Sequence, residues 1–283
     1  MLIDVGDTRL DVTERGEGDL ALFLLHGGPG LDHTMFGSYL DALGDRCRLL
    51  LVDERGTGRS EPAAPETWAL AHHAADVEAM AGALGLERYA VLGHSYGAFI
   101  ALQHAVDFPG SPAATVVSSG VPDARFLAQV EEELAAFEPV ELREQVRSSW
   151  AREAQARTQD DVAALLSDQL PFHFADPRDP RIDEMRAAMA GAVYGPDVLR
   201  AAATDDYGAI AVEDRLADVT HPVLVLAGRH DRTCPVPAAE AMAAGLPDAE
   251  LVVFEHSGHM TFVEENAGYL AAVSDFLARR VPA

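Results

Sequence analysis

Short, almost wholly apolar runs recur towards both ends of the chain, and the middle lacks them. A run of four to six apolar residues between turn-forming residues is typical of a strand buried in a parallel sheet. Two earlier segments alternate around Gly6-Asp7, a dipeptide that favours a tight turn, so they predict an antiparallel hairpin at the sheet edge. The predicted strands are residues 2–5, 9–13, 20–25, 48–52, 89–92, 114–118, 223–227 and 250–254.

Helical patterns, with apolar residues every three or four positions, alternate with these strands at residues 68–84, 96–107, 237–244 and 267–280. In the middle of the chain the strand pattern gives way to helical patterns at residues 125–137, 140–157, 161–170 and 182–194. We therefore predict an α/β fold with a mostly parallel central sheet and helices on both faces. Residues 1–120 and 220–283 would form this core, and residues 121–219 a helical cap insertion.

Composition narrows the possible chemistry and partners. The chain has 283 residues with 21 basic side chains, all arginine, against 46 acidic ones, for a net charge of −25. Without lysine there is no Schiff-base chemistry and no phosphate-loop amine. Such an acidic surface disfavours nucleic acid and anionic membranes, so we expect a small-molecule or short-peptide substrate and leave the oligomeric state open.

Neither a targeting segment nor a metal site is indicated. No apolar run approaches the roughly 20 residues of a membrane span, and Asp4 and Asp7 stand where a signal peptide would be apolar, so we expect a cytoplasmic protein. Cys47 and Cys234 are too few for a disulfide framework and lack metal-ligand spacing. We therefore predict neither a metal nor a cofactor.

The sharpest local motif is Gly-His-Ser-Tyr-Gly at residues 93–97, which follows a predicted strand and precedes a predicted helix. In this G-x-S-x-G pattern the serine occupies a strained strand-to-helix turn, and the flanking glycines leave room for it. The pattern therefore presents Ser95 as a candidate nucleophile. A serine hydroxyl needs a base and an orienting acid to become nucleophilic.

Two later loops offer that base and acid. Asp231 and His259 each follow a predicted strand, at the edge where open α/β sheets place their sites. His256 is an alternative base, but Gly258 would give His259 the more flexible loop. His230, next to the acid, is interpreted as structural.

The glycine-rich segment His-Gly-Gly-Pro-Gly at residues 26–30 follows the strand predicted at residues 20–25. Glycines allow backbone N–H groups to approach an oxyanion closely. Gly28 and Tyr96, at the start of the helix after the serine, are the candidate donors. Nucleotide binding is disfavoured because His33 replaces the last glycine of a G-x-G-x-x-G pattern.

Together these motifs resemble the proline iminopeptidase branch of the α/β-hydrolase superfamily. They are HGGPG at 26–30, DERGTGRS at 53–60, GHSYG at 93–97, GRHD at 228–231 and SGHM at 257–260. The resemblance implies an α/β-hydrolase fold and a serine hydrolase that acts through an acyl-enzyme intermediate. Ser95 would be the nucleophile, His259 the base and Asp231 the acid. This branch usually releases an N-terminal residue, often proline, and holds the substrate ammonium with acidic side chains.

The sequence departs from that branch where the ammonium would bind. Relatives often carry a glutamate in a Gly-Pro-Asn-Glu context where this chain has Val198, and some carry one where it has Arg232. The acids that could substitute are Asp197, Asp205, Asp206 and Glu213. Gly27, His94 and Arg232 are the candidate substrate contacts.

Three hypotheses follow for the function. The first is a proline iminopeptidase-like aminopeptidase, and the second a carboxylesterase or lactonase with the same triad, which needs no ammonium anchor. The third is a non-catalytic ligand receptor on a hydrolase fold, which an apparently complete triad disfavours.

Overall fold

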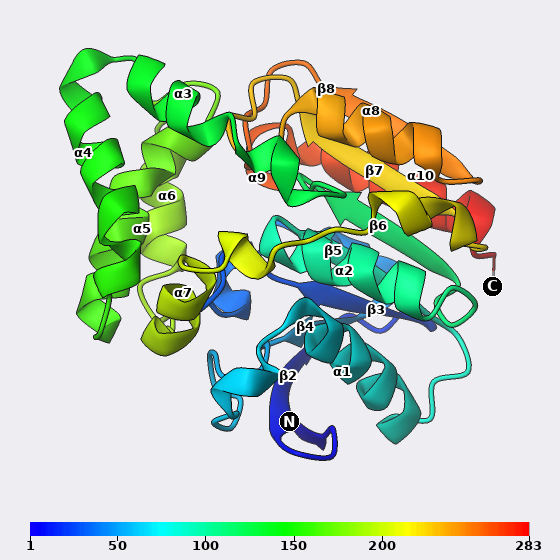
Figure 1. Ribbon diagram of the computed structural model, residues 1–283. Coiled ribbons are helices and arrows are strands. Elements are labelled where there is room, and N and C mark those ends of the chain that lie inside the picture. The colour runs from blue at the N-terminus through cyan, green and yellow to red at the C-terminus, as the bar shows by residue number, and fades with distance from the viewer. Residues whose placement is uncertain (283) are drawn as a thin grey trace.

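The computed structural model describes residues 1–282, without the side chain of Asp206, and contains an eight-stranded sheet (Figure 1). The strand order is β1-β2-β4-β3-β5-β6-β7-β8. β1 pairs with β2 and β2 with β4 in antiparallel fashion, and all other pairs are parallel. The strands are β1 (Leu2–Asp4), β2 (Arg9–Arg15), β3 (Leu20–Leu25), β4 (Cys47–Val52), β5 (Tyr89–His94), β6 (Ala114–Ser118), β7 (Val223–Gly228) and β8 (Ala249–Phe254).

The strand predictions are confirmed, with ends displaced by at most two residues. Every residue of the inner strands β5, β6 and β7 is buried, which is why their sequences are mostly apolar and show no alternation of apolar and polar residues. The predicted hairpin is the pair β1 and β2, at one edge of the sheet.

Helices cover both faces of the sheet (Figure 1). On one face, side chains such as Val77, Ile100 and Met242 pack into one hydrophobic cluster. On the other face, Val273 and Phe276 belong to a second cluster. The first face carries α1 (Leu70–Ala83), α2 (Tyr96–Asp107) and α8 (Val236–Gly245), and the second α10 (Asn266–Arg280) with the 3₁₀ turns η1 (His33–Phe36) and η2 (Asp41–Asp45).

Between β6 and β7 the chain forms a group of helices to one side of the sheet (Figure 1). We refer to this group as the cap; its division from the core at residues 121 and 219 stays a prediction. None of the helices in residues 1–282 is long and apolar enough to cross a membrane. The cap helices are α3 (Val130–Ala136), α4 (Val140–Arg152), α5 (Gln159–His173), α6 (Arg181–Ala188) and α7 (Pro196–Ala202).

The cap helices differ in length from their sequence patterns: α5 extends beyond the predicted residues 161–170 at both ends, whereas the other three patterns end early or divide. The helix expected over residues 140–157 ends at Arg152 and continues as the 3₁₀ turn η5 (Glu153–Gln155). The last pattern, over residues 182–194, breaks after Ala188, and a separate, unpredicted helix starts with Pro196 in its first turn, where proline is well tolerated. The segment over residues 125–137 likewise divides into η4 (Ala124–Leu127) and α3. Other short elements are η3 (Pro65–Thr67), η6 (Asp206–Gly208), η7 (Glu213–Asp218) and α9 (Thr261–Glu264).

Candidate active site

Ser95 occupies a sharp turn between the end of β5 and the start of α2. Its backbone angles, φ 56° and ψ −118°, lie where residues with a Cβ atom are rarely found. The flanking glycines make this turn possible: a Cβ atom on Gly93 would lie 1.9 Å from the Gly97 carbonyl oxygen, and one on Gly97 would lie 2.2 Å from that of Leu25. The turn therefore places the hydroxyl at the N-terminus of α2, at the edge of the sheet.

His259 and Asp231, on the loops after β8 and β7, form a buried hydrogen-bonded pair. His259 Nδ1 donates to Asp231 Oδ2 over 2.8 Å. Asp231 Oδ1 accepts from the amides of Thr233 and Cys234, at 2.8 and 2.9 Å. Burial by itself would raise the pKa of Asp231, but His259 and the hydrogen bonds outweigh it and hold that pKa below its usual value. An ionised Asp231 keeps the proton on Nδ1 and leaves Nε2 free to accept one.

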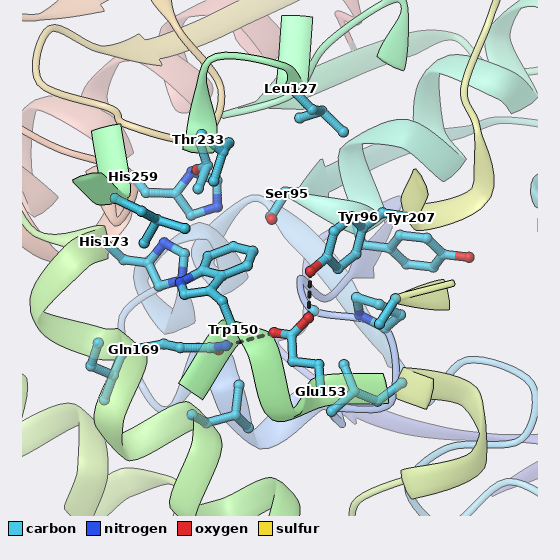
Figure 2. Close-up of a pocket in the computed structure, with 18 of the residues that line it drawn as sticks. Ser95, Tyr96, Leu127, Trp150, Glu153, Gln169, His173, Tyr207, Thr233 and His259 are labelled. Carbon is cyan, nitrogen blue, oxygen red and sulfur yellow. Dashed lines mark hydrogen bonds between the residues drawn. The ribbon is translucent and has the colours of Figure 1, made fainter. Parts of the chain in front are cut away.

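Ser95 and His259 line one cavity of about 1160 Å³ between the strand ends and the cap helices (Figure 2). No hydrogen bond joins their side chains in the part of the chain that the structure describes. Such pairs are often loose before substrate binds and tighten in the complex. The arrangement can therefore transfer a proton from Ser95 to His259 once a substrate orders the two groups.

The two candidate oxyanion donors lie beside Ser95. Gly28 and Tyr96 both line the cavity, and within residues 1–282 neither backbone N–H donates to another backbone group. Gly28 has φ +65°, a conformation in which glycine is favoured. The preceding residue, Gly27, packs closely against Ser95, since a Cβ atom on Gly27 would lie 2.8 Å from Ser95 Cβ. The loop is therefore held tightly against Ser95.

None of the three predicted substrate contacts lines the cavity. Gly27 lies behind Ser95, and Arg232 binds the cap backbone instead. His94 is fully buried, with Nδ1 3.2 Å from Ser118 Oγ and its ring 5.0 Å from that of His259. Burial lowers the pKa of His94 well below its ordinary value, so its neutral ring forms a wall behind His259.

Arg232 joins the loop of Asp231 to the cap. Its Nη1 donates to the carbonyl oxygens of Phe172 and Phe174, at 3.0 and 2.7 Å, and its Nη2 to that of Ala175 at 3.3 Å. Such orphan carbonyls at a helix C-terminus are satisfied well by a cation. Arg232 therefore fixes the end of α5 above the site.

Glu264 makes a second link between the cap and the histidine loop. Its carboxylate accepts from the Ala175 amide at 2.7 Å and from the Gly258 amide at 2.8 Å. The amide of His259 donates to the His173 carbonyl over 2.7 Å. Burial raises the pKa of Glu264 to about 7, although the two amides oppose that shift.

We predict that Glu264→Gln removes a pH dependence of stability. With a folded-state pKa of about 7 against an ordinary 4.5, folding takes up a proton between these values. Wild type should therefore lose on the order of 1–3 kcal/mol of unfolding free energy, relative to the variant, as the pH rises from about 5 to 8. Urea unfolding of both proteins across that range measures this difference. A difference that stays constant with pH would show that Glu264 titrates normally.

The structure also reveals a group of side chains around Glu153, which the sequence did not single out, and we name this group the cap cluster. The Glu153 carboxylate accepts from Gln169 Nε2 at 2.5 Å and from the Tyr207 hydroxyl (Figure 2). Burial raises the pKa of Glu153 above its usual value. The cap cluster consists of Trp150, Glu153, Gln169, His173 and Tyr207, all of which line the cavity.

Two further members of the cap cluster have buried polar atoms without partners. Among the described residues, Trp150 Nε1 and His173 Nδ1 make no hydrogen bond. Burial, reinforced by the neighbouring His259, lowers the pKa of His173 to about 3, so its ring is neutral. Unsatisfied buried polar atoms beside a cavity are typical of a ligand-binding site.

Backbone strain coincides with these contacts. Tyr207, with φ 52°, holds Glu153, and Ser119, with φ 50°, donates its hydroxyl to the His259 carbonyl at 2.9 Å. Together with Ser95, three of the four non-glycine residues with positive φ in residues 1–282 thus touch the site. Strained residues tend to cluster at functional sites.

The other candidates from the sequence lie elsewhere. His256 and His230 are exposed, and neither lines the cavity. Asp197 pairs with Arg200 on the surface. Glu213 pairs with Arg125, and Asp205 is exposed; the side chain of Asp206 lies outside the described residues.

One group of possible metal ligands occurs in the described chain, formed by Asp231, Cys234 and His259 within 4.8 Å of one another. Asp231 and His259 are already hydrogen-bonded together. Burial raises the pKa of the Cys234 thiol well above its ordinary value, which disfavours the thiolate that a metal would need. The donor set therefore fits a catalytic pair better than a metal centre.

This fold and site are those of an α/β hydrolase. The family model for the alpha/beta hydrolase fold matches residues 21–266, and the chain belongs to that family. The predicted fold class is thereby confirmed.

Comparison with related proteins narrows the type of hydrolase. Proteins named proline iminopeptidase from Levilactobacillus brevis and Lactiplantibacillus plantarum are 29% and 28% identical over 97% and 94% of this chain, and 91% and 95% of their own lengths. The crystal structure of proline iminopeptidase from Mycobacterium smegmatis matches with a TM-score of 0.76 at 25% identity, over 99% of this chain and 98% of that one. A thermophilic esterase from Thermogutta terrifontis shares the fold, with a TM-score of 0.77 at 23% identity over 99% and 98% of the two chains. The chain is a hydrolase similar to proline iminopeptidases and esterases.

Proposed function

We propose that this hydrolase releases an N-terminal residue from a short peptide or small amide, through an acyl-enzyme intermediate on Ser95. The observation that carries the proposal is Glu153, a buried carboxylate in the cavity whose hydrogen-bond partners, Gln169 and Tyr207, are both neutral. A buried charge is stable only when an opposite charge or strong donors compensate for its lost hydration. The free ammonium of a peptide N-terminus would supply that charge in the cavity that contains Ser95.

In the proposed mechanism, Ser95 Oγ attacks the substrate carbonyl carbon while His259 Nε2 takes the hydroxyl proton. Ionised Asp231 stabilises the imidazolium, and the N–H groups of Gly28 and Tyr96 bind the oxyanion. Collapse of this intermediate breaks the C–N bond, and the proton passes from the imidazolium to the leaving amine. Water then attacks the ester while His259 accepts its proton, and that proton returns to Ser95 Oγ as the acid leaves.

A panel of aminoacyl arylamides, compared with their N-acetylated forms, tests this function. We expect the free forms to be cleaved at least tenfold faster, because a charged hydrogen bond in a buried site contributes about 1.5–3 kcal/mol. Equal kcat/KM values on free and acetylated substrates would reject the aminopeptidase proposal.

The variant Glu153→Gln should lower kcat/KM on free aminoacyl arylamides by about 10- to 100-fold, since it removes the charge but keeps the side-chain shape. Activity on acyl nitrophenyl esters, which have no ammonium group, should change little. The matched control is Glu144→Gln, because Glu144 lines the same cavity but is exposed to solvent. If both variants lose the same activity, Glu153 does not bind the ammonium.

A carboxylesterase or lactonase activity is the second candidate. Burial raises the pKa of Glu153, so a neutral Glu153 would leave the cavity compatible with uncharged esters. Apolar residues such as Leu134 and Met189 line much of that cavity. Short acyl nitrophenyl esters, tested beside that panel, separate the two functions, because an esterase would cleave these esters and leave the free aminoacyl arylamides intact.

The proposed partners follow from charge, and the proposed compartment is the one expected from the sequence. We propose a small-molecule or short-peptide substrate and a cytoplasmic protein that binds neither nucleic acid nor membranes. The net charge of −25 supports this, because it repels polyphosphates and anionic lipids.

A further inference from the structure

One wall of the cavity consists of methionine and leucine side chains, and we name it the methionine wall. Of the seven methionines in the sequence, four border this cavity. The members of the wall pack together in or against a single hydrophobic cluster. They are Met35, Leu166, Leu170, Met185, Met189 and Met260, and they come from η1, α5, α6 and the loops after α6 and β8.

The methionine wall begins at the reacting groups. A Cβ atom added to Gly27 would lie 2.8 Å from Ser95 Cβ and 3.1 Å from Met35 Cε, so the Met35 methyl group and the nucleophile pack against the same glycine. The Gly27 amide donates a hydrogen bond to Met35 Sδ over 3.2 Å, and this contact holds the Met35 side chain against Gly27. Met260 directly follows His259 in the chain. A group attached next to the scissile carbonyl would therefore meet this wall.

Helix α5 contributes residues to both the methionine wall and the cap cluster. Leu166, Gln169, Leu170 and His173 follow the i, i+3, i+4, i+7 spacing of one helical face, and all four line the cavity. Gln169 donates to Glu153, while Leu166 and Leu170 pack with the methionines. The cavity thus has a polar side that carries a carboxylate and an apolar side next to Ser95.

We propose that the methionine wall binds the side chain of the substrate's N-terminal residue and selects large, flexible apolar side chains over proline and alanine. This inference rests on the proposed aminopeptidase function. Methionine has three rotatable bonds and a polarisable sulfur, so it adapts to apolar groups of varied shape. A small or rigid residue would leave part of the wall without contacts, whereas each buried methylene gains free energy.

A series of arylamides tests this preference, with N-terminal alanine, 2-aminobutyrate, norvaline and norleucine, and with proline for comparison. We expect kcat/KM to rise about three- to fourfold per added methylene, and proline to fall below norleucine. A maximum at alanine or proline would overturn the inference while leaving the aminopeptidase function intact.

If the proposed aminopeptidase function is wrong, none of these arylamides will be cleaved, which differs from a maximum at alanine or proline. If only esters are cleaved, an acyl series from acetyl to hexanoyl probes the same wall. The lack of arylamide cleavage would then reject the aminopeptidase, and rising kcat/KM along the acyl series would support the wall as an apolar acyl site. A flat acyl series would overturn the methionine wall itself.

Substitutions in the methionine wall test whether it causes the preference for large apolar N-terminal residues. The ratio of kcat/KM for norleucine to that for alanine should fall at least fivefold in Met185→Ala and in Met189→Ala. This ratio does not depend on how much of the protein is folded. The matched control is Met242→Ala, because Met242 is buried in α8 and does not line the cavity. If the ratio moves as much in the control as in the wall variants, the selectivity does not come from the wall.

Discussion

Replacing Ser95 with alanine is expected to lower kcat by about 10⁴-fold or more, the loss typical of removing a serine nucleophile. Ser95 occupies the strained turn at the start of α2, where the Gly28 and Tyr96 amides lie beside the same cavity. The variant should fold normally, because alanine only removes one oxygen that has no hydrogen bond to His259. It should also bind substrate, since the cap cluster and the methionine wall are untouched.

Steady-state kinetics on the best substrate of the panel measures this loss, and the thermal midpoint reports folding. The control is Ser111→Ala, in which the hydroxyl removed donates to Glu78 away from the cavity. We expect its kcat to stay within about twofold of wild type. A Ser95→Ala enzyme that retains more than a tenth of the activity would refute the assignment of the nucleophile.

Asp231→Asn should lower kcat by about 10⁴-fold while leaving the site geometry intact. The amides of Thr233 and Cys234 donate to Oδ1, so the asparagine oxygen must occupy that position. Its NH₂ group then faces His259 Nδ1 and donates to it. The ring proton is thereby forced onto Nε2, which can no longer accept a proton from Ser95.

This second prediction is checked by kcat at neutral pH, with Asp248→Asn as the control. Asp248 forms a surface ion pair with Arg280, and neither residue lines the cavity. The thermal midpoint should shift little in either variant. If Asp231→Asn keeps kcat within tenfold of wild type, His259 is not oriented through this carboxylate.

The strands of the sheet could be predicted because burial on both faces leaves a direct signal in the sequence. β3 and β6 occur at the predicted residues, since β3 is a continuous apolar run and β6 is a short, mainly β-branched run between turns. The turn at Ser95 was also predictable, because Gly93 and Gly97 are required by backbone contacts closer than any Cβ atom would tolerate.

The cap could not be predicted to the same depth. Its amphipathic patterns continue past the residues where helices end, as at Arg152 and Ala188. Glu153 illustrates this: in the sequence it is one acid in an amphipathic pattern, and only its contacts with Gln169 and Tyr207 distinguish it from surface acids. Tyr207 lies 54 residues away, beyond the reach of any local pattern.

Arg232 shows the same limit. Its position next to Asp231 made it a candidate for substrate contact, because a sequence gives charge and order but no direction. In the structure its guanidinium turns towards the carbonyl groups at the end of α5, which lack donors of their own at a helix terminus.

The central claim is that Ser95 is the nucleophile of a serine hydrolase, and covalent labelling tests it most directly. A fluorophosphonate reacts only with a serine that a base activates, and the intact mass then increases by one adduct. We predict stoichiometric labelling of wild type, with the adduct on the peptide that contains Ser95, and no labelling of Ser95→Ala. An unlabelled wild-type protein, or an adduct on another residue, would contradict the account.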